Sequence, residues 1–132
     1  MKENKVIIIM GSESDKDFVK KITSQLEKDN IKFEENVASA HKDPKKVLEI
    51  LEKNNASEDR IVYITVAGRS NALSGFCAAN CQQPVIACPP FATKEDFIIN
   101  INSTLMMPSK TPVLTVIDPA NAALAAKRIL DL

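Results

Sequence analysis

Residues 6–15 read VIIIMGSESD, an apolar run that ends in a glycine followed by small polar side chains. The five consecutive apolar residues Val6–Met10 are typical of a strand that is buried on both faces. Ile61–Val66 (IVYITV) is a second run of this kind, and it ends shortly before Gly68. Strands buried on both faces belong to parallel sheets that are covered by helices on either side. The two runs therefore predict the centre of a parallel α/β sheet.

Further strands and helices are expected around these two runs. Asp43-Pro44 and Asp118-Pro119 each combine an N-cap residue with a first-turn proline, so each predicts the start of a helix. The other expected elements are a helix with the apolar residues Phe18, Val19, Ile22 and Leu26 on one side, a weaker strand over 31–37, a helix over about 70–81, a strand over 84–87, a helix capped by Thr93 and Asp96 that runs toward Leu105, and a strand over 113–117.

Five strands that alternate with helices predict one three-layer αβα domain over residues 1–132. Right-handed crossovers favour a flavodoxin-like sheet with the strand order 2-1-3-4-5. The final helix is rich in alanine and includes Ala122, Ala123 and Ala126, which let another backbone approach closely. That backbone belongs either to a neighbouring subunit or to the same chain, and the sequence leaves both readings open.

The composition excludes several classes of protein. The chain has 17 Lys+Arg and 17 Asp+Glu among 132 residues, so it lacks the basic surface that nucleic-acid binding requires. No apolar run approaches the roughly 18 residues of a membrane span, and the N-terminal run is too short for a signal peptide. We therefore expect a cytoplasmic protein that binds neither nucleic acid nor a membrane. Zero net charge also permits self-association.

The three cysteines are Cys77, Cys81 and Cys88, and their spacing matches neither a CxxC motif nor a zinc site. One histidine cannot complete the usual mixed Cys/His site either. The sequence thus predicts reduced thiols that serve as small buried apolar residues.

Small and polar side chains follow three of the predicted strands, in the loops Gly11–Asp15, Ser39–Lys42 and Ala67–Asn71. In an open α/β sheet ligands bind outside the carboxyl ends of the strands, so we expect the three loops to form one site. Each loop alone fits an ordinary turn with a helix cap, and it is their coincidence at adjacent strand ends that favours a site. Neither GxGxxG nor GxxxxGK[ST] occurs, which removes the main support for a dinucleotide or P-loop site.

His41 is the only histidine of the chain and lies in the second of these loops. A free histidine titrates near pH ~6.5, so it can both accept and donate a proton at neutral pH. A lone histidine is by default more often a surface or structural residue. The position of His41 at a strand's carboxyl end, beside two other polar loops, favours proton transfer.

Several short motifs taken together resemble one enzyme family. In chain order they are MGSESD, SAHK, AGRSNALSG, ACPP, MPS and NAALAAKRIL, and they extend over nearly the whole chain. They resemble the aminoimidazole ribonucleotide (AIR) carboxylase, or PurE, family of purine synthesis. SAHK and AGRSNALSG resemble its class II branch, which uses CO2 directly, whereas class I mutases typically read SAHR and GAAHLPG. Ala72 stands where class I has a second histidine, so class II is the better match.

The resemblance implies reversible carboxylation of AIR at C4 to carboxyaminoimidazole ribonucleotide (CAIR), without metal, biotin, ATP or another cofactor. His41 would transfer the proton. The resemblance also implies the residues that bind the substrate. These are Ser12 and Asp15 for ribose and phosphate, Ser39 and Lys42 for phosphate or carboxylate, and Gly68 and Ser70 for CO2 or carboxylate. Gly11, Arg69 and Asn71 are possible further members of the site.

Two features depart from the family pattern. Lys110 stands where relatives commonly have glycine in the motif MPSG, and many relatives continue beyond the final helix, whereas this sequence ends at Leu132. The family is typically octameric, with sites built from neighbouring subunits, so the resemblance implies a homo-octamer whose geometry the shorter tail affects. Pro89-Pro90 is expected to shape a wall of the site.

Two other functions stay open at this point. One is a class I-like mutase, an isomerase that acts on N-carboxylated AIR (N5-CAIR). The other is a non-catalytic nucleotide-binding module on the same fold, since a fold alone does not fix a function. The stretch Arg69–Ala72 argues against the first alternative, and His41 argues against the second.

Overall fold

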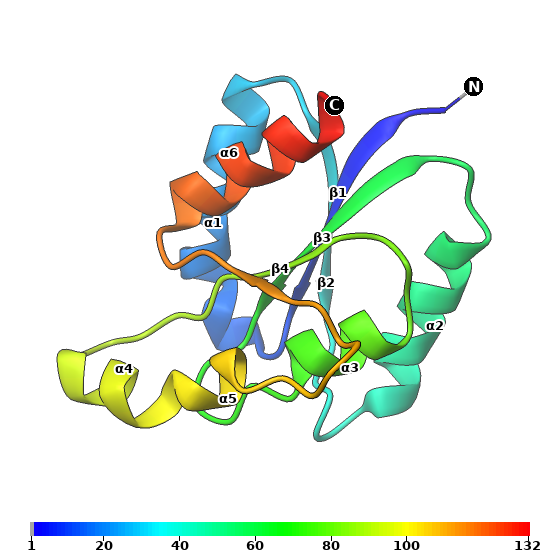
Figure 1. Ribbon diagram of the computed structural model, residues 1–132. Coiled ribbons are helices and arrows are strands. Elements are labelled where there is room, and N and C mark those ends of the chain that lie inside the picture. Colours follow the sequence, from blue (N-terminus) through cyan, green and yellow to red (C-terminus); the bar gives the residue numbers. More distant parts are fainter. Residues whose placement is uncertain (1) are drawn as a thin grey trace.

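The computed structural model describes residues 2–132 and contains one five-stranded sheet (Figure 1). In chain order the strands are β1 (Asn4–Met10), β2 (Lys32–Val37), β3 (Arg60–Val66), β4 (Val85–Ala87) and β5 (Leu114–Thr115). Their order in the sheet is β2-β1-β3-β4-β5, and every neighbouring pair is parallel. The predicted flavodoxin-like architecture and its strand order are confirmed.

Helices cover both faces of the sheet (Figure 1). One face carries α1 and α6, the other carries α2 and α3, and α4 and α5 lie at one edge of the molecule. In chain order the helical elements are the single 3-10 turn η1 (Glu13–Asp15), α1 (Lys16–Lys28), α2 (Pro44–Asn55), α3 (Leu73–Ala79), α4 (Lys94–Asn100), α5 (Asn102–Leu105) and α6 (Pro119–Leu130).

The continuous apolar run of β1 supplies both cores of the protein. Val6, Ile8 and Met10 belong to the core that β1 shares with α1 and α6. Ile7 and Ile9 point to the opposite face and belong to the core beneath α2 and α3. All five side chains are at most 1% exposed. Because successive side chains of a strand point to opposite faces, only an uninterrupted apolar run fills two cores at once.

The alanines of α6 pack within the chain. Ala122, Ala123 and Ala126 are fully buried in the core on the α1 face, and α1 and α6 lie side by side in Figure 1. Small side chains let the two helix backbones approach closely. Of the two readings of this stripe, packing within the chain is therefore the one that the structure bears out.

Three elements differ from their predicted bounds. The helix expected from about Ser70 begins only at Leu73, because Arg69 has a positive φ of 48° and the Asn71 side-chain oxygen accepts the Ser74 N–H of the first helical turn, as a cap does. The helix expected from Thr93 to Leu105 is interrupted at Ile101, which separates α4 from α5. The strand expected over 113–117 is reduced to Leu114–Thr115, because it lies at the edge of the sheet and pairs only with the three-residue β4.

The three cysteines are free thiols, and two of them have the predicted buried position. Cys77 and Cys88 are fully buried, and burial raises the pKa of each thiol to about 12. Cys81 is only partly buried, and its sulfur donates a hydrogen bond to the Gln83 carbonyl oxygen at 3.5 Å. Among the helices of residues 2–132, none combines the length and apolarity that a membrane crossing needs.

Candidate active site

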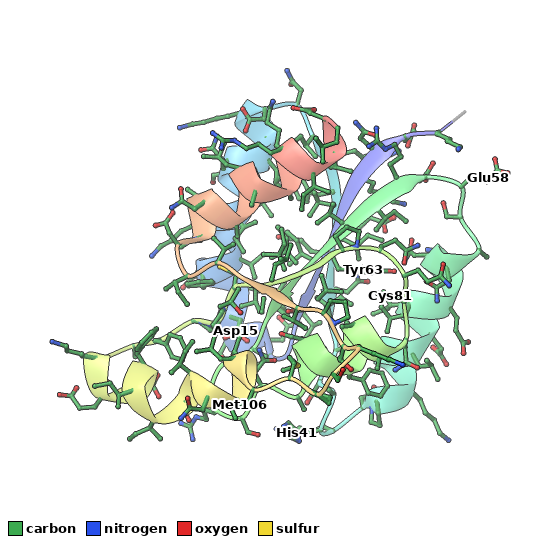
Figure 2. All side chains as sticks on the ribbon, in the orientation of Figure 1. Asp15, His41, Glu58, Tyr63, Cys81 and Met106 are labelled. Carbon is green, nitrogen blue, oxygen red and sulfur yellow. The ribbon has the colours of Figure 1, made fainter. Side chains whose placement is uncertain are left out.

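A cleft of about 720 Å³ lies at the carboxyl ends of the central strands. It gathers the loops that follow β1, β2, β3 and β4, as expected for an open parallel sheet. Figure 2 shows Asp15 and His41, from two of these loops, at this end of the sheet. The residues that line the cleft are Gly11, Ser12, Ser14, Asp15, Ser39, His41, Lys42, Ala67, Gly68, Arg69, Ser70, Pro90, Phe91, Ala92 and Asp96.

The first loop leaves β1 and enters α1 through the turn η1. The Gly11 N–H donates to the Val66 carbonyl oxygen at 3.0 Å, which ties the end of β1 to the end of β3. The Ser12 hydroxyl accepts a hydrogen bond from the Ser14 N–H at 3.2 Å and so caps the turn. Partial burial raises the pKa of the Asp15 carboxyl, and hydrogen bonding from the Ser12 backbone offsets only part of this rise. The loop thus presents hydroxyls and a carboxyl to the cleft.

The second loop is a tight turn between β2 and α2. The Ser39 hydroxyl accepts a hydrogen bond from the Lys42 N–H at 3.1 Å, and the Asp43 N–H donates to the Ser39 carbonyl oxygen at 2.8 Å. Asp43 also caps α2, as predicted, by accepting from the Lys46 N–H at 3.3 Å. These bonds hold His41 and Lys42 at the tip of the turn, where both side chains face the cleft.

His41 contacts the third loop directly. Its Nε2 atom lies 3.0 Å from the carbonyl oxygen of Ser70. A carbonyl oxygen only accepts hydrogen bonds, so the ring nitrogen must donate and Nε2 must carry a proton. In the neutral imidazole Nδ1 is then the nitrogen with the free lone pair. The contact therefore defines which nitrogen of His41 can accept a further proton.

The third loop passes so close to the fourth that a side chain at position 68 would crowd the neighbouring backbone. A Cβ atom built on Gly68 would lie 3.0 Å from the carbonyl oxygen of Pro90, closer than nearly all real Cβ contacts. Arg69 follows in the left-handed region, with φ at 48°. The close approach brings the backbone of residues 68–70 against the wall formed by Pro90.

The cleft carries charges of both signs. Its cations are Lys42 and Arg69, and neither forms an ion pair with another residue of the described chain 2–132. The Asp96 carboxylate accepts hydrogen bonds from the Ala92 N–H at 3.2 Å and from the Asn100 side-chain amide at 2.6 Å. The two cations are thus the groups available to an anionic ligand. Within residues 2–132 no cluster of three or more His, Cys, Asp or Glu side chains could hold a metal ion.

The structure brings together nine of the ten residues predicted from the sequence. The exception is Asn71, which is buried behind the third loop and does not line the cleft. Its side-chain amide donates to the hydroxyls of Ser74 at 2.7 Å and Thr104 at 3.0 Å. Asn71 therefore holds the loop from behind rather than facing the cleft.

Sequence reasoning missed most of the segment after β4, from which Phe91 and Ala92 of the loop and Asp96 of the first turn of α4 line the cleft. Phe91 packs edge-on against Phe97 with ring centroids 4.9 Å apart. The signal was available, because these residues follow a predicted strand whose carboxyl end belongs to the same edge of the sheet. In this segment only Pro89-Pro90 is predicted from the sequence to belong to the site, and Pro90 does line the cleft.

Together the fold and the cleft define an α/β protein whose polar ligand site lies at the carboxyl ends of parallel strands, with one histidine inside it.

Comparisons with known proteins identify the family. The model of the family described as AIR carboxylase matches residues 5–132. A phosphoribosylaminoimidazole carboxylase of Archaeoglobus fulgidus is 50% identical over 128 residues, which cover 97% of this chain and 69% of that protein. The crystal structure of a variant of Treponema denticola PurE2 has a TM-score of 0.91 and 40% identity, covering 99% of this chain and 81% of that one. The chain therefore belongs to the AIR carboxylase family, a family of purine-biosynthesis enzymes.

One relative carries a different name. An N5-carboxyaminoimidazole ribonucleotide mutase of Methanocaldococcus jannaschii is 41% identical over 129 residues, which cover 96% of this chain and 79% of that protein. Overall identity therefore does not separate a carboxylase that uses CO2 from a mutase.

Proposed function

We propose that this enzyme reversibly carboxylates AIR at C4 with CO2 to give CAIR. The observation that carries the proposal is the position of His41, the only histidine, inside the cleft with Nε2 bound to the Ser70 carbonyl oxygen. The family match and the relatives named phosphoribosylaminoimidazole carboxylase support the same substrate.

The cleft offers suitable partners for each part of the substrate. Ser12 and Asp15 would bind the ribose and phosphate portion, with Gly11 leaving room for the substrate beside the backbone. Lys42 and Arg69 are cations without ion-pair partners among residues 2–132, so they suit a phosphate or a carboxylate. Ser39 would assist Lys42, and the backbone of Gly68 and Ser70 would position CO2. N–H donors aimed at the new carboxylate stabilise its developing charge.

The chemistry needs one proton acceptor. The aminoimidazole ring is an electron-rich enamine, so C4 forms the new C–C bond with the carbon of CO2 when the two are held in contact. One CO2 oxygen takes the negative charge. The C4–H bond then breaks, its electron pair restores the aromatic ring, and the proton passes to Nδ1 of His41. The imidazolium formed in this step keeps its Nε2–H on the Ser70 carbonyl oxygen until Nδ1 releases the proton to water.

The second candidate is the mutase reaction, which transfers the carboxylate of N5-CAIR to C4. The mutase name of the Methanocaldococcus jannaschii relative favours it. The motif around Arg69–Ala72 favours the carboxylase, because class I mutases have a second histidine where this chain has Ala72. Lys42 in place of the arginine typical of class I points the same way.

One assay separates the two reactions. Purified enzyme is given AIR with bicarbonate, and separately N5-CAIR, and CAIR formation is followed. We expect carboxylation whose rate rises with dissolved CO2 and little turnover of N5-CAIR. Turnover of N5-CAIR alone would make the enzyme a mutase. His41→Asn is expected to retain nucleotide binding but lose most turnover, and near-normal turnover of this variant would remove His41 from the mechanism.

We further propose that the protein assembles with copies of itself through α4 and α5, as an octamer if the family's typical assembly is kept. Several large apolar side chains of this segment are exposed, namely Ile98, Ile99, Leu105 and Met106. Exposed apolar patches of this kind mark interaction surfaces.

A further inference from the structure

The hydrogen bond between His41 and Ser70 depends on a peptide group that is held from the far side. The Ser70 carbonyl oxygen and the Asn71 N–H belong to one planar peptide unit, and in a trans peptide they point in opposite directions. The Ser70 oxygen faces His41 Nε2 at 3.0 Å. The Asn71 N–H donates to the Ser103 hydroxyl oxygen at 2.8 Å. Fixing the N–H end of this unit therefore aims its carbonyl end at the imidazole.

Ser103 is itself anchored on the loop and on the helical segment around it. Its single hydroxyl proton lies between two acceptors, the carbonyl oxygens of Arg69 and Asn100, each at 2.9 Å. One side chain of α5 thus bonds on both sides of Ser70, to Arg69 and to Asn71. Ser70 itself is exposed and makes no such bond with α5.

A buried polar network holds Asn71 in place. Its side-chain oxygen accepts from the Ser74 N–H at 3.2 Å, and its amide nitrogen donates to the Ser74 and Thr104 hydroxyls. The Ser74 hydroxyl in turn shares a 2.8 Å hydrogen bond with the Thr65 hydroxyl of β3. All four side chains are at most 3% exposed. Satisfied buried networks of this kind are rigid, so the Asn71 side chain is fixed, while the Asn71 N–H is held by the Ser103 hydroxyl.

We propose that Ser103 is a positioning residue for the reaction: through the Ser70–Asn71 peptide it sets the tautomer and orientation of His41. The expected effect on turnover rests on the proposed function. The expected effect on the tautomer of His41 does not depend on which reaction the enzyme catalyses. Without the Ser103 hydroxyl, the Asn71 N–H loses its acceptor, and the Ser70 carbonyl oxygen keeps only the Ala72 N–H, at 3.1 Å, to hold it beside His41. The carbonyl is then aimed less strictly at the imidazole. His41 then distributes its proton between Nδ1 and Nε2, and a smaller fraction of the enzyme has the lone pair on Nδ1.

The chain has only one histidine, so the tautomer can be read without assignment. NMR of protein that carries isotope-labelled histidine is recorded at about pH 8.5, well above the ordinary histidine pKa of ~6.5. We expect the Nε2–H tautomer to dominate in the wild type and in Ser103→Thr, which keeps the hydroxyl, and to lose its dominance in Ser103→Ala. Asn102→Ala, at the exposed neighbouring position of α5, is the matched control and should behave as wild type.

Kinetics supply the second readout. For Ser103→Ala we expect kcat for AIR carboxylation to fall by about ten- to a hundredfold, since small misplacements of a reacting group have effects of this size, with KM for AIR changed less than about twofold. Ser103→Thr should recover most of the loss. If Ser103 had only a structural role, Ser103→Ala would lower the thermal stability. It would not change the tautomer of His41, and it would not lower kcat while leaving KM nearly unchanged.

The outcomes distinguish this inference from the proposed function. A dominant Nδ1–H tautomer in the wild type overturns the positioning role, whatever the behaviour of the variants. Wild-type turnover of AIR together with an unchanged tautomer and kcat in Ser103→Ala overturns it while leaving the proposed function intact. The expected change of tautomer in an enzyme that does not carboxylate AIR supports the positioning of His41 and refutes the reaction.

Discussion

Lys110 is strained by a backbone conformation that suits glycine. Its φ of 68° is in the left-handed region, which costs a residue with a side chain roughly 1–2 kcal/mol. The family motif MPSG has glycine here, and glycine avoids this cost in the folded state. Its more flexible unfolded chain offsets roughly 0.5–1 kcal/mol of that gain. We therefore expect Lys110→Gly to raise the free energy of unfolding by about 0.5–1 kcal/mol, or Tm by about 2–4 °C in a thermal melt.

Lys110→Ala is the control that distinguishes the effect of the backbone conformation on Tm from the effect of the lost charge. It removes the same positive charge but keeps a Cβ at the strained position, so its Tm should not rise. An equal rise in both variants would assign the effect to the charge, and a fall in Lys110→Gly would contradict the strain.

Single residues also mark the limit of what the sequence could predict about the site. Nine of the ten residues predicted from the loops at strand ends line one cleft, because the strand ends of a parallel sheet converge however the side chains pack. The place of Asn71 could not be predicted in this way. Its partners Ser103 and Thr104 lie about thirty residues further along the chain, and only tertiary packing brings them into contact.

At the scale of elements, local signals gave the most reliable predictions. The caps Asp43 and Asp118 start α2 and α6 as expected, because a cap and its first-turn proline act within a few residues. The starts and ends of α3 and β5 were wrong, because each depends on a distant partner. α3 starts late because Ser103 and Thr104 hold Asn71 in the loop before it, and β5 has only the three-residue β4 to pair with.

The alanine stripe of α6 yields a prediction at this scale. Ala126 is fully buried in the core where α6 packs beside α1, so a larger side chain has no space. We expect Ala126→Leu to lower the free energy of unfolding by about 1–3 kcal/mol through overpacking. Urea unfolding followed by circular dichroism measures the change, since the chain contains no tryptophan.

Arg128→Leu is the matched control, because it places the same side chain at an exposed position of the same helix. Its effect should stay within about 0.5 kcal/mol. If Ala126→Leu were tolerated as well as this control, the close contact of α6 with α1 would be contradicted.

At the scale of the whole molecule, half of the large apolar side chains that are exposed belong to the segment of α4 and α5, and another belongs to the edge strand β5. Ile99 and Met106 are 73% and 76% exposed, and Leu114 of the edge strand β5 is 53% exposed. Figure 2 shows Met106 on the α5 side of the molecule, away from Cys81. Zero net charge offers no repulsion that would keep copies apart. The α4–α5 segment is therefore where we expect neighbouring subunits to bind.

Self-association can be tested by light scattering after size-exclusion chromatography. We expect the wild type to have a mass several times the 14.5 kDa of one chain, and Ile99→Asp to shift it toward one chain, because a charge buried in an apolar contact is left unpaired. Leu124→Asp, on the distant helix α6, should keep the wild-type mass. Since α5 also carries Ser103, we expect the dissociated variant to turn over AIR more slowly, which links the assembly to His41. A wild type that stays monomeric at about 100 μM, far above the dissociation constants of stable oligomers, would refute this interface.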